Sequence, residues 1–365
     1  MAKIAILCPR TPRLYSAGIE TSVIHVGDGL KKAGFEVEIF TTAKKPEKNA
    51  CLNGIPIHEF PAFAPSDAYF FSPQLYFAVK KSRADIIHCN GYNNLVTLLG
   101  MLAKKKNQRL IVTLNSSGPS SAFRKLLWSP YSLLFNLFSK KADFFVCVSK
   151  FELEIFSKKI SAPRERFVFI PNGVDIDFIK SVKAGKKGNY LISIGRLVKN
   201  KGFHHILKAF PKVLEEFPSL RLKIVGEGPY KKELERMAMK LGILEKVDFE
   251  PWIPFSRRED LVRLLKKARA FVFLSAYESQ GIVVSEAIAA GTPCIVTENS
   301  GLKEFVENSG ALGVKNPENS EEVSEKIILV MKNPKKFKPK KETVWSWKKV
   351  IQTTVKEFKK LQPIS

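Results

Sequence analysis

The sequence is poor in cysteine and has no long apolar run. Five cysteines occur among 365 residues and none forms a Cys-x-x-C pair, which excludes a disulfide-rich scaffold and gives no zinc or redox motif. No stretch reaches the roughly 18 apolar residues of a membrane span, and the apolar run at residues 4–8 is shorter than a signal peptide's core of roughly 7–15 residues. Four of the cysteines stand in short apolar runs, so we expect buried free thiols in a cytoplasmic protein.

Acidic residues are also few compared with basic ones. Lys and Arg number 60 against 35 Asp and Glu, which gives a formal net charge of +25. Such a charge attracts nucleic acid, an anionic membrane surface or phosphorylated small molecules. The basic residues are spread over both halves of the chain, and neither a helix-turn-helix pattern nor an aromatic-basic RNA motif accompanies them. We therefore expect no nucleic-acid partner.

Apolar strands and helices alternate through the first half of the chain. Buried parallel strands are predicted at residues 4–8, 36–41, 85–89, 110–114, 144–148 and 167–170. This alternation predicts an α/β domain with a doubly wound sheet over residues 1–182. The polar segment 183–188 (KAGKKG) has no apolar periodicity, so we place a linker there.

The alternation restarts in the second half. Strands are predicted at residues 190–194, 220–225, 247–250, 270–274 and 293–297, within a second Rossmann-like domain at residues 189–344. A last amphipathic helix follows at residues 345–365. Open α/β sheets bind ligands at the carboxyl ends of their strands, so two such domains facing a central cleft predict a nucleotide-type ligand.

Candidate binding residues follow the first two strands of the second domain. Arg196 and Lys201 come after residues 190–194, and a guanidinium and an ammonium group together suit a diphosphate. Gly195 lies directly after the same strand. Gly228 belongs to the turn GEGP at 226–229, where glycine allows the backbone to approach a ligand closely. Taken alone, the two cations favour a solvated surface over a binding site.

A third candidate segment, 278–287 (ESQGIVVSEA), places two glutamates around a predicted helix start. The free amide groups near Gly281, Ile282 and Val283 would form an anion site. Glu278 precedes this helix, where a carboxylate is favourable simply because of the helix dipole. Glu286 lies in an otherwise apolar helix, and a buried carboxylate needs hydrogen-bond donors, which a sugar diol supplies.

Taken together, these motifs resemble the signatures of glycosyltransferase family four. The matching features are Arg196 with Lys201, the turn 226–229, Glu278 and Glu286 with seven residues between them, the following AIAAGTP at 287–293, Gly18-Ile19-Glu20, the turn PNGVD at 171–175 and the helix that begins near Trp345. The resemblance spans the chain. It implies the GT-B fold, with a final helix that crosses back to the first domain, and a hexosyltransferase that retains the anomeric configuration.

The resemblance also implies roles for individual residues. Arg196 and Lys201 would bind the donor diphosphate, and Glu278 would hold sugar hydroxyls near the amides of Gln280, Gly281, Ile282 and Val283. Glu286 would accept from the ribose diol, Trp252 would line the base pocket, and Gly18 would let the first loop approach the phosphate. The implied donor is a UDP- or GDP-sugar, and no metal or other cofactor is expected.

Two positions depart from the family pattern. Ala17 precedes Gly18 where members often have two glycines. Asn115 stands where many members carry a histidine near the sugar and the acceptor, and an amide cannot act as a base. His88, at the end of the preceding predicted strand, is the candidate to replace that histidine. The alternative for His88 is a structural histidine at a strand end.

Aromatic and basic segments mark the acceptor side. Residues 69–81 and 122–141 combine aromatic and apolar residues with flanking lysines, which suits contact with an anionic lipid surface or an ordinary core helix with basic ends. The lysine-rich stretch 332–360 suits a solvated face or the same lipid contact. The expected acceptor is a glycan or a lipid-linked molecule at the cytoplasmic face of a membrane.

Two other functions compete with the transferase. A GT-B sugar-nucleotide epimerase would convert the donor without an acceptor. An inactive protein that binds a sugar nucleotide or an anionic surface is disfavoured, because Arg196, Lys201, Glu278 and Glu286 are all present.

Overall fold

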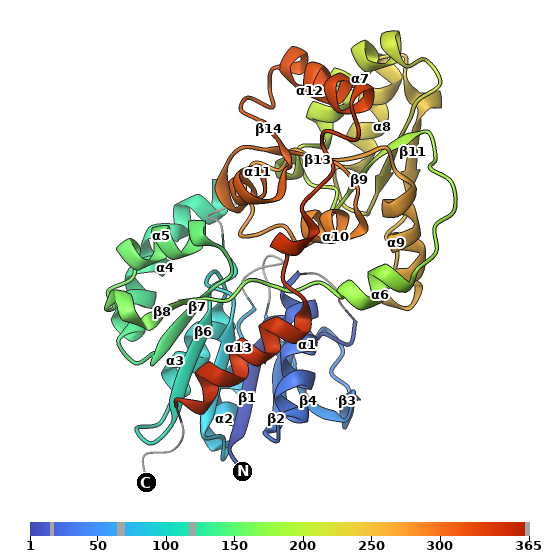
Figure 1. Ribbon diagram of the computed structural model, residues 1–365. Helices are drawn as coiled ribbons and strands as arrows, with labels where there is room; N and C mark the ends of the chain where they lie inside the picture. Colours follow the sequence, from blue (N-terminus) through green and yellow to red (C-terminus); the bar gives the residue numbers. More distant parts are fainter. Residues whose placement is uncertain (15–17, 64–69, 117–121, 362–365) are drawn as a thin grey trace. The chain divides into compact units, whose positions relative to one another are not determined.

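The computed structural model describes residues 1–14, 18–63, 70–116 and 122–361, with the backbone alone at residues 122–128 and 255. The chain forms two compact units (Figure 1). Unit 1 comprises Met1–Asn172 with Trp347–Ser365, and unit 2 comprises Gly173–Ser346. None of the helices in the described part of the chain has the length and apolar character of a membrane span.

Unit 1 is built on an eight-stranded sheet with the order β3-β4-β2-β1-β5-β6-β7-β8. Its strands are β1 (Lys3–Cys8), β2 (Glu36–Thr42), β3 (Ala50–Leu52), β4 (Ile55–Phe60), β5 (Ile86–Asn90), β6 (Arg109–Thr113), β7 (Phe144–Cys147) and β8 (Phe167–Phe169). All pairs are parallel except β3 with β4. The sequence pattern missed β3 and β4, because β4 alternates with polar residues and contains Pro56, as strands near a sheet edge can.

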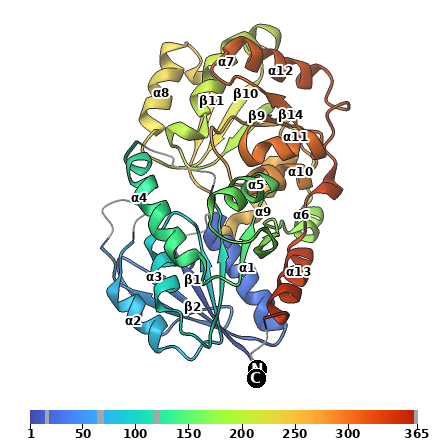
Figure 2. The same cartoon turned by 90° about the vertical axis from the view of Figure 1, so that its left-hand side faces the viewer.

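Helices cover both faces of this sheet. One face packs against α2 (Pro73–Lys81), α3 (Leu95–Ala103), α4 (Ala122–Ser139) and α5 (Lys150–Lys159), which share one core with the central strands. The other face carries α1 (Gly18–Lys32) and α13 (Trp347–Lys359), which lie side by side in Figures 1 and 2. Burial on both faces explains the nearly continuous apolar runs of the central strands. Four of the cysteines are buried free thiols, as predicted, and Cys51 is exposed.

Unit 2 contains a fully parallel sheet with the order β11-β10-β9-β12-β13-β14. The strands are β9 (Tyr190–Ile194), β10 (Arg221–Val225), β11 (Val247–Glu250), β12 (Ala270–Phe273), β13 (Cys294–Thr297) and β14 (Leu312–Val314). One face packs against α7 (Phe203–Glu216), α8 (Lys231–Lys240) and α12 (Ser320–Lys332). The other packs against α6 (Ile176–Ser181), α9 (Arg258–Lys267), α10 (Ile282–Ala290) and α11 (Lys303–Ser309).

The boundary between the units lies ten residues before the expected one. The sequence places residues 173–182 in the first domain, whereas the structure places α6 in unit 2, because Ile179 and Val182 are buried in the core of that unit. The segment 183–188 connects α6 to β9 and is tied to α9, since the backbone of Gly188 donates to Lys267. Its polar composition resembles a linker because the segment lies at a surface. The chain leaves unit 2 at Ser346, and α13 begins at Trp347 rather than at residue 345.

Candidate functional site

Four loops at the carboxyl ends of neighbouring strands carry most of the predicted residues. Arg196 and Lys201 follow β9, Gly228 follows β10, and Glu278 with Gln280 follows β12, while the loop 298–302 follows β13. The strands lie side by side in the order β10-β9-β12-β13, so their loops meet at one edge of the unit 2 sheet.

Backbone contacts hold the loop after β9 against its neighbours. The Leu197 amide donates to the Glu227 carbonyl (2.8 Å), and the Ala276 amide donates to the Asn200 carbonyl (2.8 Å). At Gly228 a Cβ atom would lie 2.3 Å from the Leu197 carbonyl oxygen, so only glycine fits. Gly195 has a φ of +159° without such a close contact. The predicted glycines thus shape the loop that carries Arg196 and Lys201.

The structure brings Lys201 and Glu278 together. The Lys201 ammonium donates a hydrogen bond to Oε1 of Glu278, and the two side chains are 23% and 13% exposed. The same ammonium lies 5.5 Å from the centre of the Phe273 ring on β12. Arg196 lies on the exposed surface of the same loop. A cation and a carboxylate at the strand ends therefore form the centre of the site.

The loop after β13 fixes the segment around Glu278. The Glu278 amide donates to the Ser300 hydroxyl (3.1 Å), and the Gly301 amide donates to the Glu278 carbonyl (3.0 Å). Gln280, two residues after Glu278, is buried. Because these bonds hold the main chain, the Glu278 side chain is presented from a firmly placed backbone.

The helix α10 begins directly after this segment. Gly281 has a φ of +90°, and α10 starts at the next residue, Ile282. Ile282 and Val283 lie four and three residues before Glu286, so the three side chains share one face, which is only partly buried. The first amides of a helix have no partner within the helix. This face thus combines unpaired helical amides with one carboxylate.

Arg258, which the sequence analysis did not select, contacts the candidate residue Glu286. It begins α9, and its Nη2 donates to Oε1 of Glu286 at 3.1 Å. Burial raises the pKa of Glu286, and the positive charge of Arg258 opposes this rise. A cation in the first turn of a helix interacts unfavourably with the helix dipole. The position of Arg258 in the sequence was therefore a sign that this side chain has an acidic partner elsewhere.

Trp252 stands apart from these contacts. It follows the edge strand β11, next to β10, and its side chain is exposed. Its neighbour Ile253 packs against the core of unit 2. The fixed backbone and the exposed ring are compatible with a surface for a flat ligand, which stays a prediction.

Two first-unit candidates, Gly18 and Asn115, follow the carboxyl ends of strands in the unit 1 sheet. Gly18 is the first residue of α1, and Ala17 lies outside the described residues. Asn115 follows β6 with a φ of +44°, and its side-chain nitrogen is buried without a hydrogen-bond partner among the described residues. The next amide, that of Ser116, donates to the buried Glu152 of α5. This loop is therefore held in an uncommon conformation.

His88 does not lie at a strand end, and this part of the prediction is wrong. It stands in the middle of β5, 3% exposed, because the strand continues to Asn90. Its Nε2 is 2.8 Å from the Thr113 hydroxyl, and its ring meets Phe358 of α13 edge-on at 5.4 Å. Burial lowers the pKa of His88 to about 4. At neutral pH the ring is therefore uncharged and a weak base.

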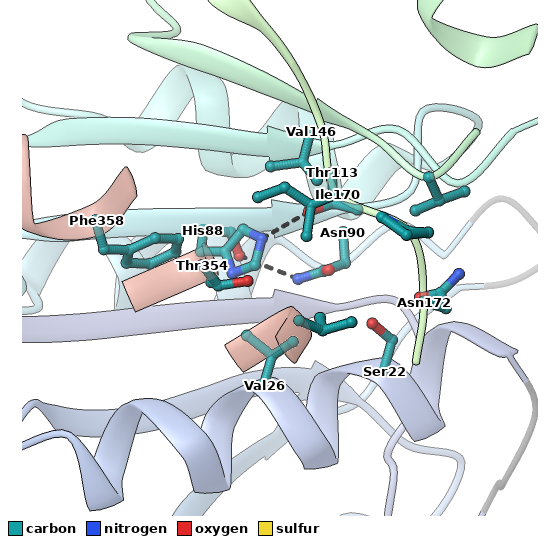
Figure 3. A pocket seen from close by; sticks show the side chains of 13 residues that line it. Ser22, Val26, His88, Asn90, Thr113, Val146, Ile170, Asn172, Thr354 and Phe358 are labelled. Carbon is teal, nitrogen blue, oxygen red and sulfur yellow. Dashed lines mark hydrogen bonds between the residues drawn. The ribbon is translucent and has the colours of Figure 1, made fainter. Parts of the chain in front are cut away.

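His88 instead lines a small pocket within unit 1, which Figure 3 shows from close by. The polar lining includes Ser22 of α1, Asn90, Asn172 and Thr354 of α13. His88 Nδ1 has no hydrogen-bond partner among the described residues. The structural alternative that the sequence left open for His88 agrees with this position beneath α13.

No group of three potential metal ligands occurs among the residues that the structure describes. Two acidic residues, Asp175 and Asp177, lie close together at the start of α6. The Asp175 side chain accepts from the Phe178 amide (3.2 Å). Asp175 therefore serves as a helix cap.

The predicted lipid-facing segments are only partly apolar core. On α4, Tyr131 and Phe135 are buried, whereas Leu133 and Leu137 are 68% and 65% exposed. The side chains of residues 122–128 and the structure of residues 69 and 117–121 lie outside the description. The lysine-rich stretch 332–360 is divided between the two units, because α13 belongs to unit 1. The helix α4 therefore presents apolar side chains both to the core of unit 1 and to the surface.

Two family models match consecutive parts of the chain. Residues 16–178 match "Glycosyltransferase Family 4", and residues 175–344 match "Glycosyl transferases group 1". An uncharacterized glycosyltransferase of Methanocaldococcus jannaschii is 25% identical over 98% of this chain and 98% of its own length. The alpha-monoglucosyldiacylglycerol synthase of Streptococcus pneumoniae is 27% identical over 81% of this chain and 72% of its own.

A solved structure shares the fold of the whole chain. HepE of Anabaena in complex with UDP-glucose superposes with a TM-score of 0.78, covering 99% of this chain and 100% of that one at 18% identity. At this identity the likeness concerns the fold.

Proposed function

The chain belongs to glycosyltransferase family four and has the GT-B fold, and on this basis we propose that it transfers a sugar from a UDP- or GDP-sugar to a glycan or lipid-linked acceptor with retention of configuration. The observation that carries the proposal is the Lys201–Glu278 pair beside the start of α10. A sugar diphosphate offers an anion to the Lys201 ammonium and hydroxyl donors to the Glu278 carboxylate.

The donor would exchange the internal pair for two external contacts. The diphosphate competes with Glu278 for the Lys201 ammonium and also engages Arg196 and the amides of Ile282 and Val283. The hydroxyls of the donor sugar then take the place of Lys201 on the Glu278 carboxylate. Lys201 stays paired with a negative charge and Glu278 stays hydrogen-bonded, which avoids the cost of an unsatisfied charge in a partly buried site.

Stabilisation of the leaving group would supply most of the rate. The bond between the anomeric carbon and the diphosphate oxygen breaks, and negative charge accumulates on that oxygen near the cations and the helix start. The acceptor oxygen forms the new bond on the same face of the sugar. Its proton passes to the departing phosphate. This scheme assigns no step to a metal.

We place the acceptor on unit 1 and propose that this unit contacts an anionic membrane. The pneumococcal relative is named as a synthase of a glucosyl lipid, which supports a lipid acceptor. The exposed Leu133 and Leu137 lie on α4, and the exposed pair Lys140 and Lys141 follows this helix. Apolar side chains beside cations suit the interface of an anionic bilayer.

Donor screening followed by product analysis tests the transferase. UDP- and GDP-sugars are added singly, and thermal unfolding reports which of them binds. The bound donor is then incubated with lipid and soluble acceptors, and the anomeric configuration of the product is determined by NMR. A product of inverted configuration, or donor conversion without any acceptor, would contradict the proposal.

Sedimentation with vesicles tests the membrane contact. Wild-type protein should bind vesicles of phosphatidylglycerol in preference to phosphatidylcholine, and the doubly substituted Leu133→Gln/Leu137→Gln protein should bind several-fold more weakly. Met239→Gln is the matched control, because Met239 is 65% exposed on α8 of unit 2. Equal binding by all three proteins would exclude this surface.

A further inference from the structure

Arg258 connects three helices of unit 2 at one point. It begins α9, its Nη2 donates to Glu286 of α10, and its guanidinium carbon lies 5.8 Å from the centre of the Phe178 ring of α6. The side chains of Arg258 and Glu286 are 11% and 14% exposed, so the pair is mostly withdrawn from water. Stacking on an aromatic ring and a charged hydrogen bond together hold a guanidinium in one orientation.

This contact determines which part of the Glu286 carboxylate a ligand can reach. Arg258 donates to Oε1 of Glu286. Among the described residues, this is the hydrogen bond recorded for the Glu286 carboxylate. The carboxylate also shares a helix face with the amides of Ile282 and Val283, one turn nearer the start of α10. A ligand whose anionic part meets those amides would therefore bring a neighbouring group to Glu286.

We propose that Arg258 is a positioning residue for recognition of the donor's ribose. By holding Oε1, it turns the second carboxylate oxygen of Glu286 toward the 2′- and 3′-hydroxyls of the nucleotide. Arg258 itself touches no part of the donor. The inference rests on the proposed function, because it takes Glu286 to face a nucleotide sugar.

The opposing charge is needed because Glu286 is buried. Burial raises the pKa of this carboxyl, and Arg258 acts against the rise. A protonated carboxyl presents one acceptor oxygen and one donor instead of two acceptors. Loss of Arg258 would therefore weaken donor binding without removing any group from the reacting atoms.

The test compares donors with and without the ribose diol in matched variants. The proteins are wild type, Arg258→Met, Arg258→Lys, Glu286→Gln and the double variant Arg258→Met/Glu286→Gln. The control is Arg257→Met, because Arg257 is the preceding residue, is 67% exposed and pairs with Asp260. KM and kcat are measured with the UDP- or GDP-sugar that wild type uses and with its 2′,3′-dideoxy analogue, and circular dichroism verifies folding.

A positioning role predicts a split between KM and kcat. Arg258→Met should raise the donor KM by about tenfold, the size expected for a hydrogen bond to a charged group, and leave kcat within about twofold. Arg258→Lys should recover most of that loss. The double variant should be no worse than Glu286→Gln, and the dideoxy donor should bind wild type and Arg258→Met equally.

Several results would overturn the inference. One is an equal loss with both donors in Arg258→Met, and another is an additive effect in the double variant. If Arg258→Met fails to fold, a wild-type enzyme that does not distinguish the dideoxy donor overturns it instead. A wild type that binds no nucleotide sugar would refute the proposed function together with this inference, whereas the other outcomes refute the inference alone.

Discussion

The ammonium group of Lys201 is bonded to the carboxylate of Glu278, 77 positions further along the chain. Lys201 ends a short turn after β9, and Glu278 lies in the loop after β12. The two loops meet because β9 and β12 are neighbours in a parallel sheet. In the sequence, three α-helices and two strands lie between β9 and β12. This pair is the part of the site that most directly links fold and proposed chemistry.

Replacing Lys201 tests the pair. Lys201→Ala should lower kcat by at least about a hundredfold, as the loss of one preorganised hydrogen-bond donor at a developing oxyanion does in other enzymes. Lys199→Ala is the control, because Lys199 is an exposed lysine of the same turn. Steady-state transfer rates with saturating donor decide the matter, and a similar rate in both variants would exclude Lys201 from the site.

Replacing Glu278 should have a different signature. Glu278→Gln keeps the size of the side chain but removes the charge that pairs with Lys201 and that would accept from the donor hydroxyls. We expect kcat to fall by about tenfold or more, because a hydrogen bond to a charged group is worth about 1.5–3 kcal/mol. Binding of the free nucleotide diphosphate, measured by calorimetry, should persist. Unchanged transfer would argue that Glu278 only pairs with Lys201.

The glycine at 228 should be irreplaceable for steric reasons. A Cβ atom there would lie 2.3 Å from the Leu197 carbonyl oxygen, so Gly228→Ala must displace the loop that carries Arg196. We expect a loss of more than about 2 kcal/mol in the free energy of unfolding, together with weaker donor binding. Gly195→Ala isolates the backbone contribution, because Gly195 has a similar φ of +159° and the nearest atoms lie 3.6 Å from its Cβ position. Urea unfolding measures the free energy of unfolding of both variants, and an equal loss in the two would refute the clash.

Stability should depend on pH through His88. Its pKa is 6.5 in the unfolded chain and about 4 when buried, so between these values the unfolded chain binds more protons. Stability is therefore fully present above about pH 6.5 and falls toward pH 4, by about 3 kcal/mol at most. Urea unfolding of wild type and His88→Gln at several pH values measures this as their difference, and parallel pH curves would contradict it.

The packing of α13 against α1 should depend on the absence of a side chain at Gly29. A Cβ atom on this residue of α1 would lie 2.5 Å from the Ile351 side chain of α13. Gly29→Ala should therefore destabilise the chain by about 1–3 kcal/mol, as overpacking does. Adding Ile351→Ala should recover part of that loss, since it removes the colliding atoms. Thermal unfolding of the single and double variants tests this compensation.

The alternation of strands and helices could be predicted because it is a local property of the chain. Apolar runs such as residues 190–194 and 110–114 correspond to β9 and β6, which are buried on both faces. The strand β4 escaped prediction because its polar residues and Pro56 resemble a loop. The assignment of α6 also escaped, because membership of a unit depends on what Ile179 packs against and not on its neighbours in sequence.

The candidate residues divide in the same way. The sequence alone was sufficient to select Arg196, Lys201, Glu278, Glu286 and the glycines as candidates, because they follow predicted strands or lie in or beside a predicted helix start in a recognisable spacing. Only the tertiary structure pairs Lys201 with Glu278, reveals Arg258 beside Glu286 and moves His88 from a strand end to a buried pocket. Spacing along a chain reports secondary structure, whereas these contacts arise from the order of strands in a sheet and from helices that pack across it. That order is a property of the whole fold, so no short segment contains it.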